Sequence, residues 1–560
     1  MTFRVLLVLV FSILPVCLLR AQPIPVSSPE LEDYYRRAQL KGELDSAVSF
    51  MVRPLLPGAA FSLSANPFYP DSSQQKKLRI NDTRAFDSGN GLLRILPFEV
   101  RLQNQTKVPY GWNDGAMIPA KGLQSVITWG VHLNYKALSL TLKPELVTAK
   151  NKLYEGFPTE YPDEDWALFF NYYHNVIDLP EQFGTSAYQR LLPGQSSLRV
   201  NVDNFSLGLS TENLWWGPGM RNSLIMSNTA PGFFHITLNT IKPVKTVAGS
   251  FEGQFIAGRL ADSKFAPIDS ARTLYEVPIY RPRNTEWRYL SGMVLTWQPR
   301  WVKGLFIGYA RTSQAYHSDL DHPADYLPFL LPVKRFKPGK FTFEDDRKSD
   351  QYASFFMRWL FPRANGEFYL EYGMNNHYAD MSRLDVAGGH SRAYVLGIRK
   401  LFPLTPVDDL SVNAEVTQLM GPGDYISKPG ESWYVNSVVR QGYTHMGQLL
   451  GAGTGPASSL QSLDLAWHRK LNFVGLRAER YLHNDDLMYY IYYDARRSWV
   501  DISYSLRLGL TRGHFAFTGE LQRNKSLNYF FFLKEQPGVF WVPGRDVVNL
   551  TTKFSVSYRF

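Results

Sequence analysis

The side chains best suited to chemistry are concentrated between residues 210 and 228. The polar and aromatic candidates of this stretch are Glu212, Asn213, Trp215, Trp216, Arg221 and Asn222. The two tryptophans offer flat apolar faces that fit the C–H edges of a sugar ring. The acid, amide and guanidinium groups offer directional hydrogen bonds, and Arg221 suits a carboxylate such as that of a uronic acid. We therefore predict that these six residues bind polysaccharide.

A structural role is the alternative for the same stretch. Gly217, Pro218 and Gly219 form a tight-turn sequence, and the tryptophans would then pack the interior while Arg221 pairs with an inward acid. A second segment rich in glycine and proline spans residues 108–122. We interpret its motif residues as a turn between strands; they are Tyr110, Gly111, Asn113, Asp114 and Gly115.

Few residues point to catalysis or metal binding. One cluster could hold a metal or a His–Asp pair; it comprises His317, Asp319, Asp321, His322 and Asp325. The sequence has no HExxH, paired CxxC or GxSxG motif, and the glycine-rich residues 451–455 lack a strand–helix phosphate-binding frame. We predict that the protein is not an enzyme and takes no cofactor or metal. A hydrolase built into a barrel remains a minor alternative.

The first 21 residues are typical of a signal peptide. Arg4 precedes an apolar stretch from Val5 to Leu19, and a plausible cleavage site follows Ala21; an uncleaved anchor helix is the alternative. The one cysteine, Cys17, lies inside this segment, so the mature chain would contain no disulfide. Loss of Arg4 and Arg20 would lower the formal net charge from +10 to +8. That excess favours anionic partners such as lipopolysaccharide, and no charge block is typical of a nucleic-acid-binding arm.

The positions that carry these side chains belong to a β protein. Mean hydropathy is −0.23 and aromatic residues make up 14% of the 560 residues. From Leu550 to Phe560, apolar and polar residues alternate, which indicates a strand with one face in an apolar medium. The same period recurs at Phe98–Leu102, Leu138–Leu142, Leu410–Val416, Val500–Leu508 and Phe515–Leu521. Further candidate strands span 124–134, 204–211, 251–259, 288–297, 304–313, 351–361, 366–373, 392–401, 435–444, 462–468, 473–481 and 487–494.

These segments predict an all-β fold, a closed antiparallel transmembrane β-barrel of about 18 strands. A soluble β-sandwich also alternates, but the segments have the roughly 9–11 residues of a tilted membrane crossing. We interpret the aromatic runs Tyr489–Tyr493 and Tyr529–Phe532 as interfacial girdles at strand ends. The predicted inward face carries both signs of charge, for example Glu99, Lys143 and Glu415. Such groups should pair and occlude the lumen, although an open porin is also possible.

Three segments do not alternate, and one of them is the long irregular stretch at 314–350. Residues 28–38 are predicted to form a short periplasmic helix, with Ser28 as the cap and Pro29 in the first turn. Residues 147–198 are long, aromatic and acidic, and we expect them to enter the lumen or to cover one mouth.

Several motifs together resemble the capsule assembly protein Wzi family. The resemblance covers residues 90–560 and is strongest between residues 108 and 260; its segments are 108–122, 178–184, 193–196, 210–228, 230–236 and 253–260. It implies an outer-membrane barrel of a Gram-negative bacterium, with a periplasmic N-terminal part and an occluded lumen. It also implies a surface lectin that takes part in capsule assembly and holds capsular polysaccharide on the cell.

The sequence therefore predicts three regions: a signal peptide at 1–21, a periplasmic segment with a short helix at 22–90, and a barrel at 91–560. The helical bundle of the family's enterobacterial members would be reduced here. The expected partners are outer-membrane lipid, lipopolysaccharide, surface or capsular polysaccharide, and the barrel-insertion machinery, which would read Phe560; no nucleic acid is expected. The alternative function is an outer-membrane channel or porin for small solutes.

Overall fold

The computed structural model describes residues 23–44, 47–56, 82–327, 348–375, 392–421 and 432–560. The predicted signal peptide, with Cys17, lies outside the described residues.

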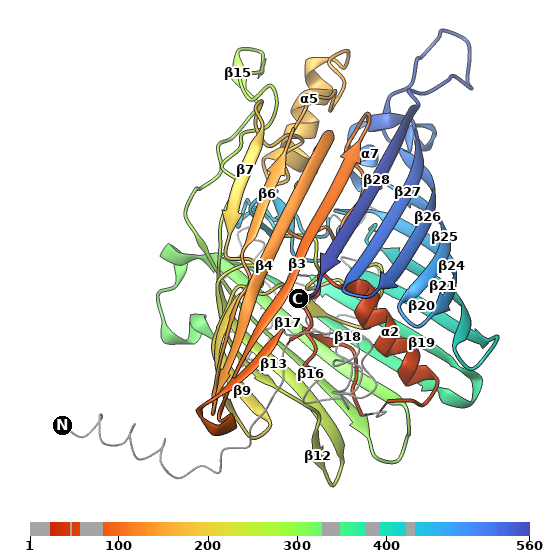
Figure 1. Ribbon diagram of the computed structural model, residues 1–560. Helices are drawn as coiled ribbons and strands as arrows, with labels where there is room; N and C mark the ends of the chain where they lie inside the picture. Colours follow the sequence, from red (N-terminus) through yellow and green to blue (C-terminus); the bar gives the residue numbers. More distant parts are fainter. Residues whose placement is uncertain (1–22, 45–46, 57–81, 328–347, 376–391, 422–431) are drawn as a thin grey trace.

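The strands close into one antiparallel barrel (Figure 1). Its wall consists of β3 (Gly91–Gln105), β4 (Gly122–Tyr135), β5 (Leu138–Leu142) with β6 (Glu145–Ala149), β7 (Tyr188–Leu192) with β8 (Ser197–Val202), β9 (Phe205–Ser210), β11 (His235–Thr240) with β12 (Val244–Thr246), β13 (Gly249–Leu260), β16 (Arg288–Pro299), β17 (Leu305–Tyr316), β18 (Ser349–Phe361), β19 (Gly366–Asn375), β20 (Arg392–Pro403), β21 (Asp408–Gln418), β24 (Ser459–Arg469), β25 (Asn472–Leu482), β26 (Val500–Arg512), β27 (Phe515–Leu527) and β28 (Val547–Tyr558). Three wall strands are interrupted: one consists of β5 and β6, one of β7 and β8, and one of β11 and β12. The described residues therefore build 18 wall strands. β28 pairs with β3, from Thr551↔Gln105 to Tyr558↔Phe98, and closes the wall.

The remaining elements are short. β2 (Thr83–Phe86) pairs with the start of β3. The others are β1 (Val52–Arg53), β10 (Trp215–Trp216), β14 (Thr273–Leu274), β15 (Val277–Pro278), β22 (Thr444–His445), β23 (Gln448–Leu449), the helices α2 (Pro29–Leu40), α5 (Asp163–Phe169) and α7 (Asp485–Ile491), and the single turns η2 (Asp87–Gly89), η3 (Phe170–His174), η4 (His317–Asp319), η5 (Pro323–Tyr326), η7 (Pro362–Ala364), η10 (Ala495–Arg497) and η11 (Tyr529–Phe531). No helix among the described residues is both long and apolar enough to span a membrane.

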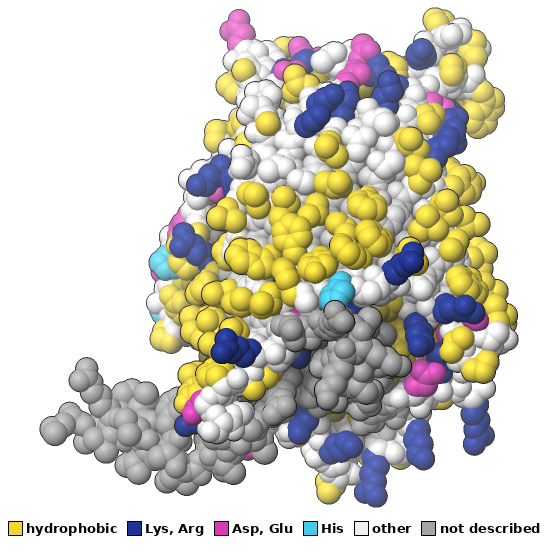
Figure 2. Space-filling view, in the orientation of Figure 1, with side chains coloured by type: hydrophobic (Ala, Val, Ile, Leu, Met, Phe, Trp, Pro, Cys, Tyr) yellow, Lys and Arg dark blue, Asp and Glu magenta, His cyan; other side chains and the backbone are white. Residues whose placement is uncertain are grey.

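The alternation predicted for the strands is confirmed. Phe554 and Tyr504 point outward and are 47% and 60% exposed, whereas Asp501 and Ser503 between the outward positions of β26 are buried. Figure 2 shows the outward apolar side chains gathered into a band across the wall, with charged side chains toward both ends. An apolar belt of this kind matches the hydrocarbon layer of a bilayer. Two stacked soluble sheets are therefore excluded.

The two ends of the barrel differ. At one end, the strands are joined by short turns such as Gly513–His514 between β26 and β27; we call it the short-turn end. At the other end, long connections carry α5 and α7 (Figure 1); we call it the long-loop end. Barrels of the outer membrane have short periplasmic turns and long extracellular loops.

Two predicted strands are wrong. Residues 487–494 overlap helix α7, and 435–444 lie in the connection between β21 and β24, which folds into the barrel. The tyrosines and phenylalanines of 489–493 and 529–532 pack with one another and with residues 157–173 over the long-loop end, so they are not lipid-facing girdles. Their apolar partners come from other loops, and tertiary packing overrides the local preference of aromatic residues for strands.

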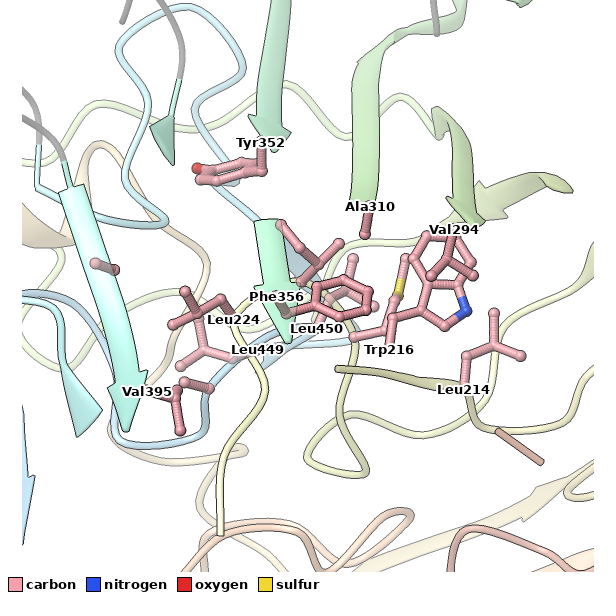
Figure 3. Packing of buried hydrophobic residues seen from close by; sticks show 14 of the residues in the cluster. Leu214, Trp216, Leu224, Val294, Ala310, Tyr352, Phe356, Val395, Leu449 and Leu450 are labelled. Carbon is pink, nitrogen blue, oxygen red and sulfur yellow. The ribbon is translucent and has the colours of Figure 1, made fainter. Parts of the chain in front are cut away.

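The barrel interior is filled from both ends. The N-terminal segment, described at 23–44 and 47–56, enters at the short-turn end, and three connections, 106–121, 211–234 and 432–458, fold in from the long-loop end; we call these four segments the plug. Apolar plug residues such as Trp216, Leu224 and Leu450 pack against inward residues of the wall such as Val294 and Phe356 (Figure 3). Each fully buried apolar side chain contributes about 1.5–3 kcal/mol. The predicted occlusion of the lumen is confirmed.

Candidate functional site

The predicted motif at 210–228 lies in the middle of the plug. Its β10 pairs with β1 of the N-terminal segment, Trp216 opposite Val52 and Trp215 opposite Arg53. Trp216 is fully buried and donates from Nε1 to Gln254 Oε1 at 2.8 Å. The Arg53 guanidinium lies 4.8 Å from the Trp215 ring centroid. The motif thus connects the N-terminal segment of the plug to the 211–234 connection.

Glu212 and Asn213 are buried in hydrogen bonds within the protein. Glu212 Oε2 accepts from Arg199 at 2.6 Å and from Ser210 at 2.8 Å. The Asn213 amide donates to Asn228 Oδ1 and Ala230 O, both at 2.8 Å, and accepts from Gln195 at 2.9 Å. Both side chains therefore hold the plug to the wall.

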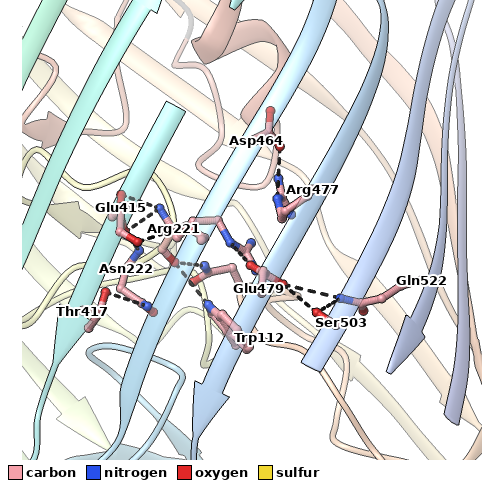
Figure 4. A network of polar contacts seen from close by, with 12 residues as sticks. Trp112, Arg221, Asn222, Glu415, Thr417, Asp464, Arg477, Glu479, Ser503 and Gln522 are labelled. Atoms are coloured by element: carbon pink, nitrogen blue, oxygen red, sulfur yellow. Dashed lines mark hydrogen bonds and ion pairs between the residues drawn. The ribbon is translucent and has the colours of Figure 1, made fainter. Parts of the chain in front are cut away.

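Arg221 and Asn222 lie where the plug meets β21 and β25 (Figure 4). Glu415 accepts from the backbone N–H groups of Met220, Arg221 and Asn222 at 2.7–3.1 Å. The Arg221 guanidinium pairs with Glu479 at 2.8 Å. Its charge is therefore neutralised inside the protein, as the structural alternative required.

The turn residues Gly217–Gly219 sit between charged side chains. Gly217 has φ +130°, and an added Cβ would lie 2.8 Å from Glu371 Oε2, so the position favours glycine. Arg53 donates to Gly217 O at 2.7 Å, and Arg36 donates to Pro218 O at 2.9 Å. The turn thus presents its carbonyls to cations of the N-terminal segment.

The predicted motif at 110–115 is part of the connection between β3 and β4. It folds inward and meets the other plug segments. Asn113 donates to Arg221 O at 2.7 Å, and Gly115 donates from its backbone N to Asn228 O at 2.7 Å. Asp114 pairs with Lys553 at 2.6 Å beside Gly111, and Tyr110 and Trp112 are buried against Tyr481.

The N-terminal helix is held by buried ion pairs. Ser28 occupies the predicted cap position but makes no side-chain cap hydrogen bond. Glu367 accepts from Arg36 Nε at 2.8 Å and from Arg358 Nε at 2.6 Å, and all three side chains are fully buried. Asp33 pairs with Arg399 at 2.5 Å and with Arg37 at 2.8 Å. Charge pairing in the lumen, predicted from the inward residues, is confirmed.

Acid is expected to loosen this helix through Asp33. Burial alone would raise the pKa of Asp33, but Arg399 and Arg37 outweigh burial and hold the pKa well below its usual range. A depressed carboxyl pKa stabilises the folded state above the unfolded pKa, about 3.9, and this stability is lost as pH falls further. We expect helix α2 to become accessible to pepsin, a protease active at acid pH, as the pH falls below about 4. Asp33→Asn should weaken this pH dependence, and an unchanged acid profile would contradict it.

Several cavities remain between the plug and the wall. A small one, about 130 Å³, is lined by Glu212 among others, and two others are larger. The inner cavity, about 310 Å³, reaches from Asp33 of α2 to Trp112 and is lined by several paired charges, including Arg221 and Arg477. The outer cavity, about 270 Å³, lies between Trp112 and the long loops that carry Tyr154 and Trp499. Of the six predicted sugar-binding residues, Trp215 and Arg221 line the inner cavity and none lines the outer one.

Trp112 separates the two cavities. The Arg221 guanidinium lies 4.7 Å from its ring centroid, and Arg221 lines only the inner cavity. The indole Nε1 donates to Arg221 O at 3.2 Å. Arg221 therefore covers Trp112 from the inner side, and the rest of the ring lines the outer cavity.

Sequence reasoning did not select the aromatic residues of the outer cavity as ligand candidates. They are Tyr110, Trp112, Tyr154, Phe169, Tyr173, Tyr481, Trp499, Phe530 and Phe531. The available signal was the aromatic density of 154–173 and 529–532. These segments come together only because the strands that bear them close into a barrel.

Members of the His–Asp cluster near 317–325 contact other side chains. Among the described residues, no three His, Cys, Asp or Glu side chains are arranged to hold a metal ion. The His317 ring lies 4.3 Å from that of Trp287, and Asp319 pairs with Lys348 at 3.2 Å. The glycine-rich residues 451–455 belong to the plug, where Gly453 contacts Trp112 too closely for any larger side chain.

The closed wall, the apolar band and the filled lumen define an outer-membrane β-barrel with an internal plug. The model of the family "Capsule assembly protein Wzi" matches residues 113–468. The chain belongs to this family, and its location is the outer membrane.

One of the solved structures agrees on the fold, and two others show a weaker likeness. Wzi of Escherichia coli, described as a carbohydrate-binding β-barrel of the outer membrane involved in group 1 capsule assembly, is 12% identical, with a TM-score of 0.57 over 95% of this chain and 98% of that one. OccAB2 of Acinetobacter baumannii is 11% identical, with a TM-score of 0.40 over 82% and 97%. OccAB3 of the same species is 9% identical, with a TM-score of 0.37 over 83% and 98%. No curated protein matches the chain.

Proposed function

We propose that this protein retains capsular or other surface polysaccharide on the cell by non-covalent binding at its long-loop end, without turnover and without a cofactor. Family membership supports a role in capsule assembly. The observation that carries the binding role is the outer cavity, where aromatic side chains and hydrogen-bonding groups converge beside the long loops. Weak contacts repeated along a long glycan would add up through avidity.

Capsule retention tests this proposal directly. A strain of the source organism that lacks the gene should release most of its polysaccharide into the medium, while total polysaccharide stays the same. Re-expression of the intact chain should restore the cell-associated fraction. If the deletion strain keeps its capsule cell-associated, retention is not the function of this protein.

A channel is the alternative function, and the filled lumen argues against it. Trp216, Arg36 and Glu367 are fully buried inside the wall. We expect the purified protein to show no large steady conductance in planar bilayers at neutral pH. Stable open steps of the wild-type protein would favour the channel.

The other proposed partners are lipid, lipopolysaccharide and the barrel-insertion machinery, and each is inferred from exposed residues of the barrel. The apolar band would contact outer-membrane lipid, and the basic excess would favour lipopolysaccharide. The ring of Phe560 lies 5.3 Å from that of Tyr558, and Phe560 is 39% exposed, which supports its proposed recognition by the insertion machinery. Trp215 and Arg221 would contact a saccharide only if it entered the inner cavity.

A further inference from the structure

The outer cavity has an aromatic lining suited to sugar rings. Trp112 and Tyr481 meet edge to face with ring centroids 5.7 Å apart, and Trp499 stacks on His483 at 3.8 Å. Both pairs line the cavity. Aromatic rings held rigidly in this way lose little conformational entropy when a ligand packs against them. The volume, about 270 Å³, is close to the lower limit of small-molecule pockets, roughly 300 Å³, so the cavity fits a small saccharide unit.

Polar atoms in this lining lack partners. Thr454 Oγ1 and Glu181 Oε2 are buried and have no hydrogen-bond partner among the described residues. The nearest cationic candidate for Glu181, His174 Nε2, is 3.7 Å away, beyond hydrogen-bond distance. A buried polar atom without a partner is costly. Hydroxyl groups of a ligand in the cavity would satisfy both atoms.

The titratable side chains of the lining include carboxylates and one imidazole, that of His483, which pairs with Asp501 at 2.8 Å. None of the described residues that line the cavity is lysine or arginine, and its carboxylates are Asp114 and Glu181. Lys553 neutralises Asp114 at 2.6 Å from the inner side. Glu181 therefore gives the cavity a negative side when His174, 3.7 Å away, is neutral. Burial and Glu181 together raise the pKa of the buried Tyr154 well above its usual value. A ligand carboxylate would be repelled.

We propose that the outer cavity is a subsite for an uncharged sugar unit that packs on Trp112 and donates hydroxyl hydrogen bonds to Glu181 and Thr454. This inference rests on the proposed function and narrows it. The subsite selects a neutral residue of the glycan and disfavours uronic acids, in contrast to the uronate binding that Arg221 suggests from sequence.

Binding to immobilised oligosaccharides tests the subsite. The probes are neutral glucose, galactose, mannose and N-acetylglucosamine oligomers, and galacturonate and glucuronate oligomers of the same length, with the full chain in detergent. We expect at least one neutral oligomer to bind at least about tenfold more tightly than every uronate oligomer. Tighter binding of a uronate oligomer would overturn the charge selection.

Two variants locate the binding. Thr454→Val should weaken neutral binding by about three- to tenfold, the range for one hydrogen bond, and Glu181→Gln by about tenfold or more, because a charged acceptor is lost. The matched control is Thr128→Val, since the Thr128 hydroxyl is also buried without a partner but does not line the cavity. Thermal unfolding of each variant checks that the fold is intact.

The outcomes distinguish a failure of the proposed subsite from a failure of the proposed function. If neutral oligomers bind but Thr454→Val and Glu181→Gln change nothing, the subsite is wrong and glycan binding lies elsewhere. If the wild-type protein binds none of the oligomers, the subsite is overturned, and the capsule-retention experiment decides the function independently.

Discussion

Glu367→Gln is expected to release the N-terminal segment from the barrel. Glu367 neutralises the buried guanidinium groups of Arg36 and Arg358. The substitution leaves two buried cations facing each other, and breaking a buried ion pair costs about 3–5 kcal/mol. Trypsin digestion in detergent, followed by mass spectrometry, should show rapid cleavage after Arg36 or Arg37, which are buried in the wild-type protein. The wall should persist because its strands pair with one another independently of α2.

The matched control for this prediction is Glu160→Gln. Glu160 also pairs with an arginine, Arg545, but its side chain is 52% exposed at the long-loop end. Exposed ion pairs contribute about 0–1 kcal/mol, so this variant should resist trypsin as the wild-type protein does. If both variants resist equally, the Glu367 pairs do not hold the helix.

Glu415→Leu is expected to open the centre of the plug. Glu415 accepts hydrogen bonds from three consecutive backbone N–H groups of the 211–234 connection and from the Tyr369 hydroxyl at 2.8 Å. The substitution leaves four donors without this acceptor, two of them on the fully buried residues Asn222 and Tyr369, and each hydrogen bond to a charged group contributes roughly 1.5–3 kcal/mol. Two measurements follow: conductance steps should appear in planar bilayers, and a Ser223→Cys reporter, buried in the intact plug, should react faster with a thiol reagent.

Asn413→Leu is the control for this effect. Asn413 lies two residues earlier on β21 and lines the same inner cavity. In the described part of the chain, its side chain makes no hydrogen bond to the 211–234 connection. The Asn413→Leu variant should leave the Ser223→Cys reporter slow to react with the thiol reagent, and it should show no conductance steps in planar bilayers. Slow labelling and no conductance in Glu415→Leu would mean that packing alone secures the plug.

Much of the wall could be predicted from local pattern. Apolar side chains at every second position, as from Leu550 to Tyr558, are exposed only where one side of a strand meets lipid. The pattern failed at 487–494 because a run of aromatic residues also suits the apolar side of a loop helix. There, Leu487 and Met488 pack on Trp166 and Phe531 of other loops.

The sequence by itself determined the barrel, the strand faces, the inward charges and the short helix at Pro29, because each depends on neighbours within a few residues or on the medium at one face. Only the tertiary structure decided where the plug residues meet. Barrel closure brings Trp216 beside Val52, Glu415 beneath Arg221, and Thr454 beside Tyr481. Most of the candidate groups at 212–222 therefore make internal contacts, although Trp215 Nε1 and Asn222 Oδ1 have no hydrogen-bond partner among the described residues. The unpaired oxygens of Thr454 and Glu181 instead lie at a cavity built from distant loops. Residue type determines which chemistry a side chain can perform. Closure of the barrel determines which of these side chains are left without internal partners and can therefore bind a ligand.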